Sequence, residues 1–131
     1  MSRREIKIEY PLSTKSLALV WKLIGSAEGF AKWMADYVEE WDEGYTFIWG
    51  EPWTAQEVRK ARLLEKVKGK RVRFCWEEDD PSNYFEIRIG ASEFSGNLFL
   101  EITDHVEEGE EESIRDVWGH DLDKMHSVTG F

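Results

Sequence analysis

Hydrophobic and charged residues alternate at the start of the chain in the pattern of a strand with one buried face. The hydrophobic positions of this strand are Ile6, Ile8 and Tyr10. Pro11 is expected to end it. Helical spacing follows and predicts an amphipathic helix that Ser13 caps and Gly25 ends, with a second, shorter helix over residues 27–34. The chain is therefore predicted to open with one strand and two helices.

The middle of the chain returns to the two-residue period and predicts six strands between about Val38 and Ile102. Glycines and acidic residues mark turns between them, as at Asp42-Glu43-Gly44 and at Gly69. The stretch over residues 56–67 is ambiguous, because its hydrophobic residues also fit a helix. Its neighbouring strands favour one long strand with a bulge.

The last segment carries one continuous apolar stripe at helical spacing. The stripe consists of Ile114, Val117, Trp118, Leu122 and Met125. A helix over residues 110–127 would be about 27 Å long, whereas a strand of about seven residues spans about 23 Å. This helix is long enough to cross a curved sheet. The prediction is a single α+β domain over residues 1–131 with an antiparallel sheet.

Composition and charge narrow the classes of partner. The chain has 131 residues and a net charge of -10, which disfavours nucleic acid and anionic membrane surfaces. No apolar run approaches the roughly 20 residues of a membrane-spanning helix. The sequence has one cysteine, Cys75, and no leader-like segment before the first strand, so the cytoplasm is the expected location.

Two acidic runs, residues 77–80 and 107–112, fit two interpretations. They suit calcium binding or a patch for a basic protein surface, and they equally suit a solvated turn and a charged helix start. Neither run has the alternating oxygen ligands of a calcium loop, and acidic residues stabilise the first turn of a helix. We favour the solvated interpretation and keep a basic protein surface as an alternative partner.

Three short motifs and the order of the elements carry a family resemblance. The motifs are Val20-Trp21-Lys22-Leu23-Ile24, Ala31-Lys32-Trp33-Met34-Ala35-Asp36 and Trp118-Gly119-His120-Asp121-Leu122-Asp123-Lys124-Met125. They resemble the START-like (SRPBCC, helix-grip) superfamily, and within it the branch related to the activator of the heat-shock-protein-ninety ATPase. The resemblance implies a curved, seven-stranded antiparallel sheet wrapped around a long C-terminal helix, with two short helices after the first strand. It also implies a deep cavity between the sheet and the last helix.

Aromatic residues, including seven tryptophans, come from every part of the chain. One interpretation is that they only fill the core, as large apolar side chains ordinarily do. The other is that rigid indoles meeting from a curved sheet and a helix leave a cavity for an apolar ligand. The candidate ligand-binding residues are Phe47, Trp49, Trp53, Phe74, Trp76, Phe85, Trp118, Leu122 and Met125. Trp53 is expected at the mouth of this cavity.

Candidates for catalysis or metal binding are sparse. His120 and Asp116 fit one helical face, but two ligands do not close a metal site. Cys75 shares a strand face with arginines such as Arg73, and nearby cations lower a thiol pKa. Pairing of these arginines with strand acids such as Glu86 is the simpler interpretation. We therefore predict no catalytic residue, no metal and no cofactor.

Three functions fit these features. The favoured one is a non-enzymatic domain that binds an apolar or amphipathic small molecule, lipids included, between the sheet and the last helix. The first alternative is a protein-interaction module that acts as a chaperone regulator through a basic partner surface. The second is a cyclase-like enzyme, which requires a polar group inside the cavity, and Tyr10 and His126 are its candidates.

Overall fold

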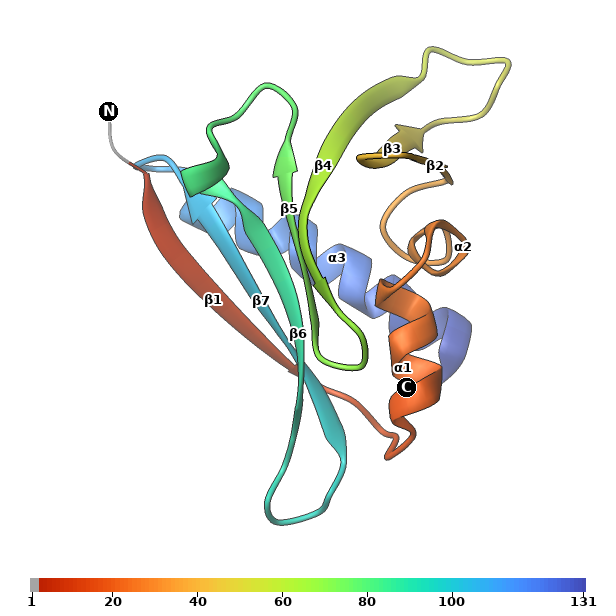
Figure 1. Cartoon of the computed structure of the whole chain (residues 1–131), viewed down its shortest axis with the longest axis vertical. Coiled ribbons are helices and arrows are strands. Elements are labelled where there is room, and N and C mark those ends of the chain that lie inside the picture. The colour runs from red at the N-terminus through yellow and green to blue at the C-terminus, as the bar shows by residue number, and fades with distance from the viewer. Residues whose placement is uncertain (1–2) are drawn as a thin grey trace.

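The computed structural model describes residues 3–131 and contains one antiparallel sheet, two short helices after the first strand and a long last helix (Figure 1). The elements are β1 (Arg4–Pro11), α1 (Leu17–Ile24), α2 (Ala27–Phe30), β2 (Tyr37–Trp41), β3 (Gly44–Trp49), β4 (Glu57–Val67), β5 (Arg71–Trp76), η1 (Pro81–Asn83), β6 (Phe85–Ala91), β7 (Leu98–Val106) and α3 (Glu111–Thr129). The predicted α+β helix-grip architecture is confirmed.

The sheet has seven strands in the order β1-β7-β6-β5-β4-β3-β2. Strands β2 to β7 follow one another as neighbours, whereas β1 pairs with β7, with Ile8 opposite Ile102. The pairing of β4 with β5 shifts register between Leu63 and Glu65. This shift confirms the long, bulged strand that was favoured over a helix. Because a bulge bends its strand, it helps the sheet to curl.

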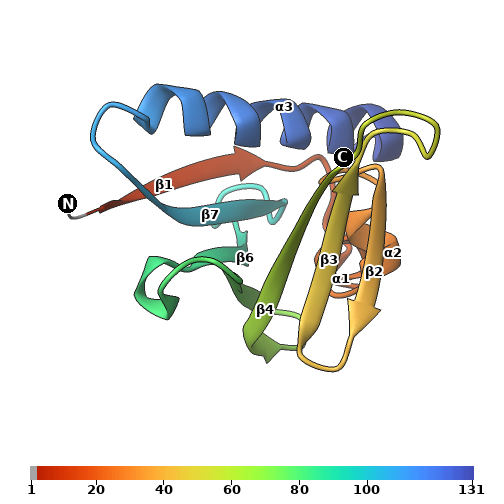
Figure 2. The same ribbon diagram turned by 90° about the horizontal axis from the view of Figure 1, so that it is seen from above.

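Helix α3 lies along one face of the curved sheet, and α1 and α2 lie beside β2, β3 and β4 (Figure 2). Within the apolar stripe of α3, Trp118, Leu122 and Met125 are buried in the core. Val117 of the predicted stripe is instead 57% exposed. Among residues 3–131, no helix combines the length and the apolar character that crossing a membrane requires.

Two details of the helices differ from the prediction. Ser16 caps α1 by accepting a hydrogen bond from the N–H of Leu19, so the expected cap at Ser13 is wrong. The Ser13 N–H instead donates to the carbonyl of Phe131, 2.7 Å away, which ties the loop before α1 to the end of the chain. Helix α2 ends at Phe30, and the remainder of the predicted helix forms tight turns.

Aromatic rings fill the space between α2 and the sheet. Phe30 has no exposed surface and meets three rings edge-on, with centroids 5.5 to 5.8 Å away. These rings belong to Tyr45, Phe47 and Phe74. Trp33 is also fully buried and donates its indole N–H to the Leu23 carbonyl at 2.9 Å.

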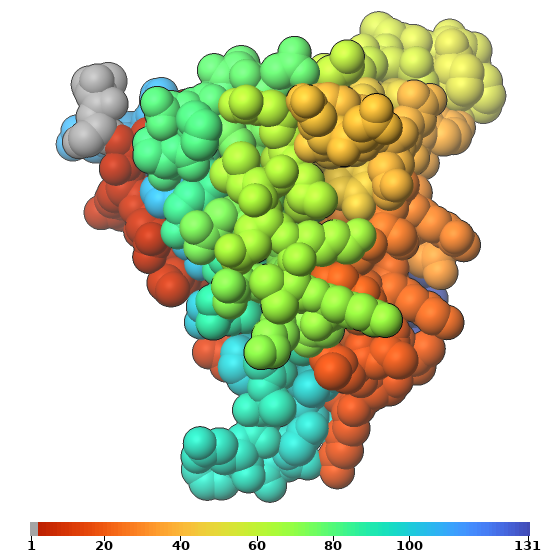
Figure 3. All heavy atoms as spheres, in the orientation of Figure 1, coloured from red at the N-terminus to blue at the C-terminus, as the bar shows by residue number. Residues whose placement is uncertain are grey.

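The opposite face of the sheet is visible in the space-filling view, where side chains of β4 cover much of the centre and the β6–β7 hairpin projects at the bottom (Figure 3). On this strand Glu57, Val58 and Leu64 are exposed. Ala61 of β4, in contrast, is fully buried and belongs to the core cluster. One face of the sheet therefore supports the core, and α3 covers that core from the far side.

Candidate functional site: an indole-lined cavity beside the last helix

A cavity of about 450 Å³ lies between the first half of α3 and the ends of β3, β4 and β5. We call it the indole cavity. Its lining residues are Met34, Trp49, Glu57, Arg59, Trp76, Asp104, Ile114, Val117, Trp118 and Asp121. Indoles reach it from three elements, because Trp49 ends β3, Trp76 ends β5 and Trp118 lies on α3. The volume suits a small organic molecule.

Hydrogen bonds and ring contacts hold the indoles in place. The Trp49 N–H donates to the Met34 carbonyl at 2.9 Å, and the Trp118 N–H donates to Asp104 Oδ2 at 2.8 Å. The centroids of Trp49 and Trp76 are 6.5 Å apart with the ring planes tilted by 52°. Because the indole N–H groups of Trp49 and Trp118 are both hydrogen-bonded, these side chains present apolar ring surface to the cavity.

Two carboxyl groups in the cavity are poorly solvated. Burial raises the pKa of Asp121 to about 7, and the Lys124 ammonium offsets only part of this effect. Burial also raises the pKa of Asp104, although N–H bonds from Trp118 and from the His105 backbone favour its charged form. A perturbed acid in an aromatic cavity marks a site where binding or chemistry is favoured.

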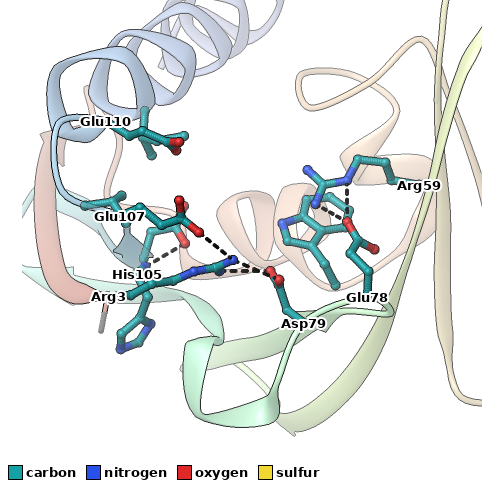
Figure 4. A pocket seen from close by; sticks show the side chains of 11 residues that line it. Arg3, Arg59, Glu78, Asp79, His105, Glu107 and Glu110 are labelled. Carbon is teal, nitrogen blue, oxygen red and sulfur yellow. Dashed lines mark hydrogen bonds and ion pairs between the residues drawn. The ribbon is translucent and has the colours of Figure 1, made fainter. Parts of the chain in front are cut away.

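A second, more polar pocket of about 380 Å³ adjoins the indole cavity and shares Arg59, Trp76, Asp104 and Ile114 with it. Arg3 and Arg59 form ion pairs with other residues of its lining (Figure 4). Arg3 pairs with Asp79 at 3.0 Å, and Arg59 donates to Glu78 with N–O distances of 2.5 and 3.1 Å. Both arginines of this pocket are therefore already matched to carboxylates.

The predicted ligand-binding residues divide into three groups. Trp49, Trp76 and Trp118 line the indole cavity. Five others are packed in the core with at most 1% of their surface exposed, namely Phe47, Phe74, Phe85, Leu122 and Met125. Trp53 lies between β3 and β4, is 81% exposed and is not among the residues that line the cavity. The structure thus gathers three of the four tryptophans of the predicted set beside the first half of α3.

The other candidates lie outside the cavity. Tyr10 donates to Asp123 at 3.3 Å, and His126 is exposed. Cys75 is fully buried opposite Arg62, and burial raises the pKa of its thiol, which disfavours the reactive thiolate. Arg73 pairs with Glu86 at 2.9 Å, as the simpler interpretation predicts. Over residues 3–131, no cluster of three potential metal ligands occurs.

Asp104 and Asp121 were not foreseen from the sequence, although each leaves a signal there. Asp104 continues the inward face of β7 after the buried Leu100 and Ile102, so it stands where an apolar residue is expected. Asp121 follows Trp118 by one helical turn and therefore shares its side of α3. A charged residue that interrupts a buried face indicates a cavity or a polar partner.

Comparison with known proteins gives the family context. Residues 1–131 match the model of the START-like superfamily domain. A protein from Bacteroides fragilis, solved by NMR, is 32% identical, with coverage of 100% of this chain and 94% of that chain and a TM-score of 0.65. No curated protein matches the sequence.

Two solved structures of Aha1 and AHSA1-like proteins share the fold. An AHSA1-like protein from Aeromonas hydrophila is 12% identical with a TM-score of 0.76, over 97% of this chain and 92% of that one. The Aha1 dimer from Colwellia psychrerythraea is also 12% identical, with a TM-score of 0.65 over 98% and 96%. These neighbours confirm the predicted resemblance at the level of the fold.

Proposed function

We propose, from the premise that this chain belongs to the START-like superfamily, that it binds an amphipathic small molecule in the indole cavity. The observation that carries the proposal is the meeting of Trp49, Trp76 and Trp118 around about 450 Å³ of space. Apolar ring surface favours the hydrocarbon part of a ligand, while the carboxyl groups offer polar contacts.

The ligand lies beside the first half of α3 rather than along its full length. Leu122 and Met125, on the second half, have no exposed surface and pack into the core cluster. At the first half, Val117 is exposed and lies on the cavity lining, so it marks the edge where a ligand enters. The site is thus a short cavity that holds a small molecule or one end of a longer one.

Binding can be tested by titration calorimetry with three probes that share an octyl chain, each below its micelle-forming concentration. The probes are octyl glucoside, octyltrimethylammonium and octyl sulfate. We expect at least one to bind the unmodified protein. Val117→Trp places a large side chain on the cavity lining and should abolish this binding.

Val128→Trp is the matched control, because Val128 is 56% exposed on the same helix but lies away from the cavity. It should bind like the unmodified protein. Failure of all three probes to bind would reject the proposed function. Equal binding by the two variants would place the ligand elsewhere.

The two alternative functions stay predictions. Likeness to the Aha1 dimer at 12% identity concerns the fold alone, so the chaperone-regulator alternative gains no site from it. For a cyclase-like enzyme, Tyr10 and His126 do not line the indole cavity. The polar groups that do line it favour the binding of a ligand of particular charge.

A further inference from the structure

We infer that the ligand of the indole cavity is an organic cation, an apolar body that carries an ammonium group. The inference rests on the proposed function and adds the chemical class of the ligand. It follows from three features of the cavity: the surplus of carboxyl groups, the engagement of Arg59, and the indole rings of Trp49, Trp76 and Trp118.

Carboxyl groups outnumber cations on the cavity lining. Glu57 lies on β4, Asp104 on β7 and Asp121 on α3, so acidic groups face the space from three elements. No ion pair within 4.0 Å joins any of these three to a basic side chain of residues 3–131. A ligand that brings a positive charge would provide the missing partner.

Arg59, the one cation on the lining among residues 3–131, is already engaged on two sides. Its guanidinium donates to Glu78, and its central carbon lies 3.9 Å from the centre of the Trp76 ring. An anionic ligand would have to compete with Glu78 for this group while lying among three carboxyls. The net charge of -10 adds a further barrier to anions and attracts cations.

Indole rings complete a site for an ammonium group. Ring faces attract cations, and cages of aromatic side chains are a recurrent means of binding quaternary ammonium groups. Trp49, Trp76 and Trp118 supply such rings from three elements, and the Arg59 guanidinium over one face of Trp76 shows that this ring accepts a cation. The carboxyls then add charge attraction that an aromatic cage alone lacks.

Burial raises the pKa of Asp121 to about 7, so at neutral pH this carboxyl is only partly ionised. A bound cation favours the ionised form and therefore expels a proton. Glu57, Arg59 and Asp104 share the cavity, and Lys124 is the other charged group that acts on Asp121. Binding near neutral pH should therefore be accompanied by proton release from Asp121.

The three octyl probes test the inference directly. We expect octyltrimethylammonium to bind about 10-fold more tightly than octyl glucoside, with octyl sulfate weakest. Asp121→Asn should weaken the ammonium probe about 5-fold or more and leave octyl glucoside unchanged. Calorimetry in two buffers of different ionisation enthalpy should show proton release for the unmodified protein and little for this variant.

Asp116→Asn is the control, because it removes the same charge from an exposed position on α3 that does not line the cavity. Glu57→Gln is a second test, because it removes a carboxyl group of the cavity lining at an exposed position and does not disturb the core. It should weaken binding of the ammonium probe and leave octyl glucoside unchanged. Equal affinity for the ammonium and glucoside probes, or tighter binding of octyl sulfate, would overturn the inference and leave the proposed function standing. Failure of every probe would remove both.

Discussion

Replacing Asp121 with Asn should stabilise the protein, and the gain should grow as the pH rises. Asn has nearly the shape of Asp but cannot ionise. The Asp121 carboxyl lies beside Trp118 in the indole cavity, where burial raises its pKa from 3.8 to about 7. An acid of this kind holds its proton more tightly in the folded chain than in the unfolded one, so ionisation opposes folding.

The sign and size follow from these two pKa values. Well below pH 3.8 the carboxyl is protonated in both the folded and the unfolded state, so Asp121 has no effect on stability. From there to pH 7 the unfolded chain ionises first, so the free energy of unfolding falls as pH rises, and above pH 7 the full penalty applies. The complete shift corresponds to about 4 kcal/mol. Solvent reaches part of the side chain, which reduces the expected penalty to about 2 kcal/mol.

Urea denaturation followed by tryptophan fluorescence measures this effect. At pH 8 we expect Asp121→Asn to gain about 2 kcal/mol, and at pH 5.5 about 1 kcal/mol. Asp116→Asn, which alters an exposed position, should differ from the unmodified protein by a similar amount at both pH values. A gain for Asp121→Asn that is equal at both pH values, or larger at pH 5.5, would refute the burial argument.

Three further substitutions test the packing that supports the site, each by urea denaturation. Trp33→Ala removes a fully buried indole and its hydrogen bond to Leu23, and should cost about 3 to 5 kcal/mol; a smaller loss would show that the core there is loosely packed. Gly29→Ala would place a Cβ 1.8 Å from the Lys22 carbonyl oxygen, so we expect a loss above about 3 kcal/mol, and a neutral result would contradict this close approach. Glu86→Gln should cost about 2 kcal/mol, because the buried carboxylate accepts from Arg73 at 2.9 Å, and high salt should shrink the difference only slightly.

Periodicity in the sequence predicts most of this fold because one face of nearly every element is buried. The alternation of hydrophobic and charged residues predicts β5 correctly because Val72 and Phe74 are buried in the core. The same rule is ambiguous for β4, where the register shift between Leu63 and Glu65 breaks the two-residue period. Local rules fail where a residue distant in the sequence determines the hydrogen bonding. The N–H of Ser13, for example, donates to the carbonyl of Phe131, and Ser13 does not cap α1.

The location of the candidate site was harder to predict than its composition. Abundant indoles indicated an aromatic site, and Trp49, Trp76 and Trp118 do meet around a cavity. The sequence did not show that Phe30 would fill the space above Phe47 and Phe74. Which rings become core and which line a cavity depends on how α2 docks, and no local pattern encodes that docking.

The pairing of β1 with β7 has a consequence for synthesis on the ribosome. Pro11 ends β1 and Leu98 begins β7, so 86 residues, 12–97, lie between the two strands. At about 5 to 20 residues per second, the β1 segment is made roughly 4 to 17 s before its partner, and for that time both of its backbone edges are unpaired, whereas one edge stays open in the folded sheet. Charged residues alternate with hydrophobic ones along β1, at Glu5, Lys7 and Glu9, and charged side chains on an edge strand disfavour its pairing with another chain. The charges that alternate along β1 thus protect the chain before it has folded.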